Sequence, residues 1–175
     1  MDWYEIVLEV IDMRSFSNLW YWIALAVLWS TTSHWVLGVP YDMVLRARRH
    51  GGQSQIDLET LVRINTNRLL HISRVSGLWL LGFAFFTLTV LGLLGFYYGI
   101  EFAQALFLLV FPMTIVGMLS LSAARLIDGG EDTGDILFKR LRKHRLVTQV
   151  IGMISIFVTA MFGMYQNLSI GALGQ

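Results

Sequence analysis

Long apolar segments alternate with charged segments along this chain. Four stretches, at about residues 17–38, 75–99, 102–124 and 146–170, carry no Lys, Arg, Asp or Glu in their interior. Each is long enough to cross about 30 Å of hydrocarbon as a helix, which takes roughly 20 residues. Because lipid offers the backbone no hydrogen-bond partner, helices are the structure that such segments can adopt. The pattern predicts an all-α protein that crosses a bilayer four times.

Basic residues concentrate in two of the connecting segments. Twelve of the 13 Lys and Arg residues lie in residues 39–74 and 125–145, whereas residues 1–16 carry four acidic residues and one arginine. Lys and Arg are enriched in the cytoplasmic loops of membrane proteins. We therefore expect both basic segments in the cytoplasm and both termini outside, in the periplasm, for a multi-pass protein of a bacterial inner membrane.

Helical periodicity continues beyond the apolar segments. Residues 2–13 place acidic side chains on one face and apolar side chains on the other, which is typical of a short helix in the membrane interface. Asp57 is a candidate N-cap for a helix that continues into the second span, and Thr133 or Asp135 for one that continues into the fourth. The predicted fold is an integral membrane four-helix bundle with cytoplasmic extensions of the second and fourth spans, in a single domain over residues 1–175.

Composition supports this fold class and excludes several chemistries. Hydrophobic residues make up 55% of the 175 residues and charged residues only 14%, against about 25% charged residues in soluble domains. The absence of cysteine excludes disulfides, thiolate metal sites and catalytic thiols. No nucleophile-elbow, zinc-protease, P-loop or dinucleotide motif occurs. We expect no enzymatic activity, no cofactor, no metal and no nucleic-acid partner.

Small residues recur at the spacing that lets membrane helices pack closely. Gly95 and Gly99 form a GxxxG step, and Ser155, Thr159 and Gly163 form a line along the fourth span. In lipid, close packing and interhelical hydrogen bonds replace the hydrophobic effect as the driving force. These residues are predicted to pack within the chain or, alternatively, against another subunit, which leaves a homo-oligomer open.

Three histidines lie at the predicted cytoplasmic ends of the spans. His34 follows the hydroxyl run at residues 30–33, and at that depth it needs a polar partner or water. His71 and His144 lie at the corresponding ends of the second and fourth spans. Two histidines that face each other could ligate haem, and a polar site around His34 could serve a transporter. The other reading of His34 is a structural hydrogen bond.

Seven basic residues are candidates for docking a partner protein in the cytoplasm. The function predicted from them is a non-enzymatic membrane accessory or scaffold subunit, whose partners are membrane lipids and another membrane or membrane-associated protein. The alternatives are a small homo-oligomeric transporter or channel with its polar site around His34, and a haem- or quinone-binding redox subunit. The docking candidates are Arg46, Arg48, Arg49, Lys139, Arg140, Arg142 and Lys143.

Several stretches resemble a family of small membrane proteins from alphaproteobacteria. They are MRSFSNLW at residues 13–20, SHWVLGVPYD at residues 33–42, and IGMISIF at residues 151–157 followed by MYQN at residues 164–167. Members of that family are commonly labelled component of the SufBCD complex, the iron–sulfur assembly machinery. The resemblance covers nearly the whole chain and implies a membrane platform for that machinery. Without cysteine, this chain cannot itself hold a cluster through thiolates or carry sulfur.

Overall fold

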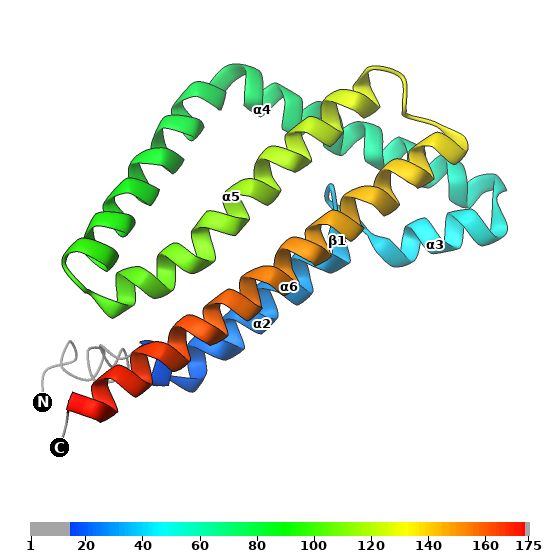
Figure 1. The fold of residues 1–175 in the computed structure, drawn as a ribbon. Coiled ribbons are helices and arrows are strands. Elements are labelled where there is room, and N and C mark those ends of the chain that lie inside the picture. Colours follow the sequence, from blue (N-terminus) through cyan, green and yellow to red (C-terminus); the bar gives the residue numbers. More distant parts are fainter. Residues whose placement is uncertain (1–14, 174–175) are drawn as a thin grey trace, which may run out of the picture.

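Residues 15–173 are helical apart from one short β-hairpin and the turns. The computed structural model describes residues 15–173, with side chains through residue 169, so the predicted interfacial helix at residues 2–13 lies outside the described residues. Figure 1 shows α5 and α6 running side by side, with α2 along α6. The elements are η1 (Ser15–Ser17), α2 (Leu19–His34), β1 (Trp35–Val36), β2 (Val39–Pro40), α3 (Tyr41–His50), α4 (Gly52–Gly92), η2 (Leu93–Tyr97), α5 (Glu101–Asp128) and α6 (Gly134–Leu173).

α2 is shorter than the predicted first span. Its N-cap is Asn18, whose side-chain oxygen accepts a hydrogen bond from the backbone N–H of Trp20 (3.0 Å). The helix has 16 residues and ends at His34, whereas the predicted span ran over residues 17–38. The prediction was too long because the last part of that segment forms the β-hairpin, which reverses the chain.

The hairpin turns within two residues. Leu37 and Gly38 have positive φ angles of 52° and 75°, the conformation that a two-residue hairpin turn requires. The register pairs Val36 with Val39, and both side chains are buried. Asn65 of α4 donates from Nδ2 to the Gly38 carbonyl oxygen (3.1 Å), and a Cβ at Gly38 would lie 3.0 Å from that nitrogen. Both the turn and the approach of α4 therefore favour glycine here.

α4 is one continuous helix of 41 residues that contains most of the predicted second span. Positive φ angles at Gly51 and Gly52 turn the chain from α3 into α4. Asp57, the predicted N-cap, lies inside the helix, where its carboxylate accepts a hydrogen bond from Gln53 Nε2 (2.7 Å). That prediction was wrong because the glycine pair, rather than a side-chain cap, sets where the helix begins. Figure 1 shows that α4 changes direction about halfway along its length.

α5 and α6 both extend beyond the spans predicted within them. α5 has 28 residues and contains Pro112, and α6 has 40 residues. Thr133, one of the two predicted caps, directly precedes α6. The first backbone N–H of α6, at Gly134, donates to Oε1 of Glu59 on α4 (2.9 Å). A carboxylate at a helix N-terminus satisfies a free amide and complements the helix dipole, so α4 helps to fix where α6 begins.

The largest buried apolar cluster lies where the hairpin and α3 meet the start of α4, the end of α5 and the start of α6. In water, burial of apolar surface stabilises a fold by about 25 cal/mol per Å². Lipid tails provide no such drive, because they are as apolar as the side chains. The hydrophobic effect would therefore stabilise this cluster only where water surrounds it. Its buried members are Val36, Val39, Val44, Ala47, Leu58, Val62, Ile127, Leu137 and Leu141.

Away from this cluster, the long helices expose large apolar side chains. Leu78 and Trp79 on α4 are each 84% exposed. Among residues 15–173, three helical segments are long and apolar enough to cross a membrane: α4 with η2, α5 and α6. Soluble proteins rarely expose such continuous apolar surface, so these helices have the surface of membrane helices. α2 is shorter, at about 24 Å from its 16 residues.

α2 and η1 pack along α6 at glycines of α6. A Cβ at Gly152 would lie 2.8 Å from the ring of Trp29, and a Cβ at Gly163 would lie 3.2 Å from the ring of Phe16. Both aromatic side chains are buried. Ser155 and Thr159, the other predicted packing residues of this helix, have buried side chains as well. The small residues of α6 thus let two aromatic side chains of the same chain approach its backbone.

The predicted GxxxG step supplies one helix contact rather than two. Gly95 is buried in η2, and a Cβ there would lie 2.9 Å from the backbone nitrogen of Gln104 on α5. Gly99 lies in the turn before α5 with a φ of 72°, and nothing lies within 4 Å of the position of its Cβ. The prediction fails at Gly99 because the helix ends at Tyr97.

Candidate functional site

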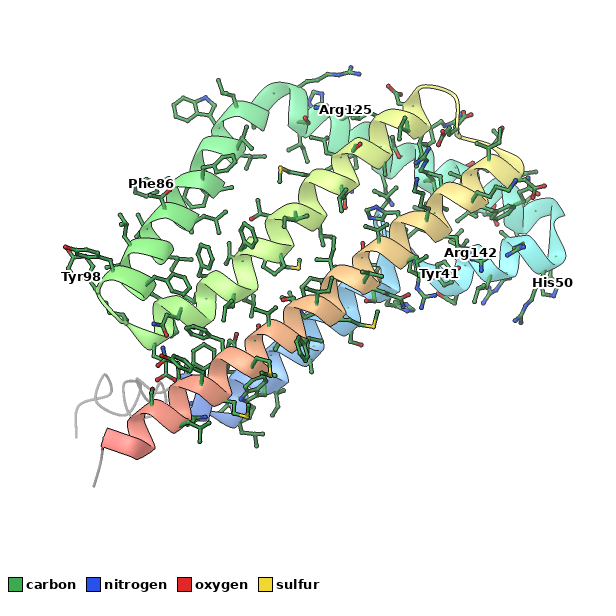
Figure 2. The ribbon with its side chains drawn as sticks, in the orientation of Figure 1. Tyr41, His50, Phe86, Tyr98, Arg125 and Arg142 are labelled. Atoms are coloured by element: carbon green, nitrogen blue, oxygen red, sulfur yellow. The ribbon has the colours of Figure 1, made fainter. Side chains whose placement is uncertain are left out.

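Basic side chains of α3 and α6 meet at one end of the molecule. Arg48 of α3 lines a cavity of about 200 Å³ together with Lys139 and Arg142 of α6, and Asp135 and Phe138 of α6 complete the lining. Figure 2 shows Arg142 at this end, near α3 and its last residue, His50. Two segments far apart in the sequence therefore bring three cations and one carboxylate around one cavity. We call the exposed cations of these two helices the basic surface: Arg46, Arg48, Arg49, Lys139, Arg142 and Lys143.

Arg140, the seventh predicted docking residue, faces a carboxylate instead of the surface. Its Nε and Nη2 both donate to the Glu131 carboxylate, with Nη2 2.6 Å from Oε1. The hydrogen bond from Arg140 lowers the pKa of Glu131 below its ordinary value. The side chain of Arg140 is also only partly exposed. A guanidinium that is already paired in this way is unsuited to docking, so the basic surface leaves Arg140 out.

Arg145 connects α6 to the end of α2 and to the start of α3. Its Nε donates to the backbone carbonyl oxygen of Ser33 (3.2 Å), and its guanidinium carbon lies 3.9 Å from the centroid of the Tyr41 ring. The first contact satisfies a carbonyl group in the last turn of α2, and the second has cation–π geometry. Sequence reasoning missed this role because Ser33 is 112 positions away in the chain.

The three histidines singled out in the sequence have different surroundings. The His34 side chain is 54% exposed, and its Nε2 lies 3.9 Å from Oδ1 of Asp42 on α3. His71 is exposed on α4. Nε2 of His144 lies 3.3 Å from the Ser120 hydroxyl oxygen. Among the side chains that the structure describes, no group of three His, Asp or Glu residues could hold a metal ion.

A second cavity, of about 350 Å³, lies against the β-hairpin and draws its lining from α2, α4, α5, α6 and the hairpin. We call it the hairpin pocket. Its apolar lining includes Trp35, Leu69 and Val116, and none of its lining residues is acidic. Of its polar residues, the sequence had pointed to the hydroxyl run and to His144 only. The polar lining residues are Thr32, Asn65, Arg68, Ser120, His144 and Thr148.

Hydrogen bonds assign roles to several of these polar groups. The Ser120 hydroxyl donates its single proton to the Val116 carbonyl oxygen (2.8 Å), so its contact with His144 Nε2 makes the imidazole the donor. Thr148 is only 2% exposed, and its hydroxyl has no hydrogen-bond partner within the described residues. Arg68 is exposed, and none of the ion pairs among the described residues includes it. The pocket is therefore lined by residues with unpaired donors, among them the exposed Arg68 guanidinium and the buried Thr148 hydroxyl.

A buried amide joins η2, α5 and α6 at the opposite end of these helices. Gln104 donates from Nε2 to the Gly95 carbonyl oxygen (2.8 Å) and accepts at Oε1 from Gln166 Nε2 (2.7 Å). Next to it on α5, Glu101 accepts the backbone N–H of Phe16 (2.7 Å). These polar groups already have partners within the chain, so their role is to hold the helices together.

Comparisons with known protein families, with curated proteins and with solved structures find no match for this chain. The structure alone therefore defines its class. Within residues 15–173, it is a helical protein with three helices long and apolar enough to cross a membrane. The basic surface and the hairpin pocket both draw residues from the first part of α6.

Proposed function

We propose that this protein is a non-enzymatic membrane subunit that crosses the bilayer four times and docks an acidic partner protein at its basic surface. The observation that supports docking is the meeting of Arg48 with Lys139 and Arg142 around one cavity. Complementary charge speeds encounter and favours the correct partner over others. A surface assembled from two distant basic segments suits this role better than either segment alone.

The first crossing in this proposal is α2, despite its 16 residues. α2 follows the apolar part of α6, since Trp29 lies on Gly152 while Phe16, just before α2, lies on Gly163. A helix that packs along a membrane helix occupies the same depth in the bilayer. A short span is accommodated by local thinning and by flanking aromatic side chains, and Trp20 and Trp35 are exposed near the two ends of α2.

The proposed orientation places the basic surface in the cytoplasm and both termini in the periplasm. Lys and Arg are enriched on the cytoplasmic side of membrane proteins, and 12 of the 13 basic residues belong to the two segments on that side. The buried cluster of the hairpin, α3 and the adjoining helix ends then stands in water. In that location the hydrophobic effect stabilises the cluster.

The family resemblance suggests the first partner to test, the SufBCD iron–sulfur assembly machinery. A chain with no cysteine cannot ligate a cluster through thiolates. In this proposal the protein is therefore a membrane platform that holds the assembly complex by charge, while the chemistry belongs to the partner.

Two matched double variants test the docking proposal. Arg48→Ala with Arg142→Ala removes two cations from the basic surface, and Arg63→Ala with Arg125→Ala removes two exposed cations elsewhere. Each variant of the full chain is purified in mild detergent at about 0.1 and 0.5 M salt, where surface charges are screened to different degrees. Co-purifying proteins are then quantified by mass spectrometry.

We expect a partner that wild type and the Arg63/Arg125 variant retain at low salt, and that the Arg48/Arg142 variant loses. High salt should release the same partner from wild type. A chain that purifies alone under every condition would contradict the proposal, as would a partner that both double variants retain equally.

A further inference from the structure

We propose that the hairpin pocket binds the phosphate headgroup of an anionic phospholipid from the cytoplasmic leaflet. This inference rests on the membrane placement in the proposed function and adds a ligand and a site to it. The pocket combines unpaired hydrogen-bond donors with an apolar wall, and a phospholipid presents acceptor oxygens next to hydrocarbon.

The polar chemistry of the pocket selects an acceptor-rich ligand. The protons of Thr32 and Ser120 are taken by backbone carbonyl oxygens (2.7 and 2.8 Å), and the Asn65 amide donates to Gly38. The donors that remain are the Arg68 guanidinium, the Thr148 hydroxyl, the second N–H of the Asn65 amide and the Trp35 indole N–H. A buried hydroxyl without a partner destabilises the free protein, so a ligand oxygen that accepts its proton removes that penalty on binding. A phosphate offers several such oxygens to these donors.

The charge and position of the pocket favour an anionic lipid. No acidic residue lines it, so nothing repels a phosphate or attracts a cationic headgroup. Thr32 and Thr148 belong to the ends of proposed spans where the cytoplasmic headgroups lie. Basic pockets between membrane helices on that side are a recurring site for anionic headgroups.

The size of the pocket restricts what it can hold. A volume of about 350 Å³ falls at the lower end of the range for small-molecule sites. It accommodates a headgroup but not two acyl chains, which would leave along α4. Ile72 lines the pocket and is partly open to the outside, and Val75 continues that exposed apolar surface.

The test uses the full chain, delipidated in a neutral detergent, and three probes. These are phosphatidylglycerol, phosphatidylcholine with the same acyl chains, and inorganic phosphate. We expect phosphatidylglycerol alone to raise the thermal unfolding midpoint and to remain bound one to one in native mass spectrometry. An equal shift with phosphatidylcholine would overturn the requirement for an anionic lipid. An equal shift with inorganic phosphate would overturn the lipid assignment in favour of a soluble phosphate ligand.

Substitutions separate the pocket from general charge effects. Arg68→Gln should weaken phosphatidylglycerol binding roughly tenfold, because it removes a charged hydrogen bond. Arg63→Gln, which removes an exposed cation of the same helix outside the pocket, should leave binding unchanged. Thr148→Val should raise the thermal unfolding midpoint of the protein without lipid. It should also reduce the additional increase in the midpoint that phosphatidylglycerol causes. A folding defect would not produce these two opposite effects.

Two outcomes distinguish this inference from the proposed function. Equal binding by Arg68→Gln and Arg63→Gln, in a chain that resists carbonate extraction from membranes, would overturn the lipid site and leave the docking proposal intact. The docking proposal is tested separately, by loss of the co-purifying partner from the Arg48/Arg142 variant. That measurement does not involve Arg68. Extraction of the chain by carbonate would overturn the membrane placement on which both proposals depend.

Discussion

Gln104 shows how single polar residues hold helices together in a largely apolar protein. Replacement by leucine removes the hydrogen bonds to Gly95 and Gln166 and leaves the Gly95 carbonyl oxygen without a donor. Such bonds between membrane helices contribute about 0.6–2 kcal/mol each. We expect Gln104→Leu to lower the free energy of unfolding by about 1–2 kcal/mol, measured by denaturant titration in micelles.

The matched control is Gln53→Leu. Gln53 is exposed at the start of α4 and bonds only to Asp57, one helical turn away. Surface substitutions of this kind change the free energy of unfolding by no more than about 0.5 kcal/mol. If the two variants unfold at the same denaturant concentration, the amide at Gln104 does not stabilise the packing of η2, α5 and α6.

Single-residue roles could be predicted from the sequence only where they depend on charge pattern. The clustering of cations pointed to six residues that the structure leaves exposed on α3 and α6. It could not reveal that Glu131, in the turn before α6, folds back onto Arg140. Nor could it reveal that Thr148 lines a pocket with Arg68, because that contact depends on how α4 and α6 meet. His34 illustrates the same limit, since its partner Asp42 comes within reach only through the hairpin turn.

At the scale of helices, the contact between α2 and α6 depends on Gly152. A Cβ there would lie 2.8 Å from the Trp29 ring, and Trp29 is buried, so it has little room to move. We expect Gly152→Ala to lower the free energy of unfolding by about 1–3 kcal/mol, the usual range for overpacking. Thermal unfolding in detergent, followed by circular dichroism, measures the effect.

Gly117→Ala is the control for this prediction. Gly117 also lies inside a long helix, α5, but nothing lies within 4 Å of its Cβ position. Alanine favours a helix over glycine by up to about 1 kcal/mol, so this variant should be as stable as wild type or more stable. A Gly152→Ala protein as stable as Gly117→Ala would mean that α2 packs elsewhere on α6.

The pairing of Glu131 with Arg140 makes the start of α6 sensitive to acid. Its hydrogen bond lowers the Glu131 pKa from the ordinary value of 4.5, so the pair stabilises the fold at any pH above that value. The contribution is lost as the pH falls through the lowered pKa. We expect a carboxyl-carbon NMR titration to give a midpoint below 4.5 for Glu131. Arg140→Gln should raise that midpoint, whereas Arg142→Gln, without a hydrogen bond to Glu131, should change it little.

The sequence predicts which segments are helical better than it predicts where each helix ends. Long apolar runs correctly indicated α4, α5 and α6, because a run of that length has few other structures available. The ends of α2 and η2 depend on backbone reversals at Leu37–Gly38 and Gly99, for which the apolar pattern carries no signal. The start of α6 depends in part on Glu59, a carboxylate from another helix.

At the scale of the whole molecule, the two ends of the long helices differ in the kind of surface they expose. One end has a buried apolar cluster and exposed cations, as a domain in water has. The long helices leading away from it keep their apolar side chains exposed, as proteins in lipid do. The two parts share α4, α5 and α6, so a tilt of these helices in the bilayer would move the basic surface with them.

The absence of cysteine allows a direct test of this division, since one introduced cysteine is the only thiol in the chain. Figure 2 shows Phe86 on the outer side of α4 and Tyr98 directly after η2, where they are 67% and 69% exposed. Asp132, in the turn before α6, is exposed as well. A protein in water would therefore react with a water-soluble maleimide at all three positions.

In the proposed topology the three positions react differently. Tyr98→Cys should be labelled by a membrane-impermeant maleimide in intact spheroplasts, and Asp132→Cys only after the membrane is opened. Phe86→Cys should stay unlabelled in both states and react only after denaturation in detergent. The bilayer covers this side chain, which the protein itself leaves exposed, and prevents a thiol there from ionising. Labelling of Asp132→Cys in intact spheroplasts would show that the orientation is the reverse of the proposed one. Labelling of Phe86→Cys in native membranes would show that this part of α4 is in water.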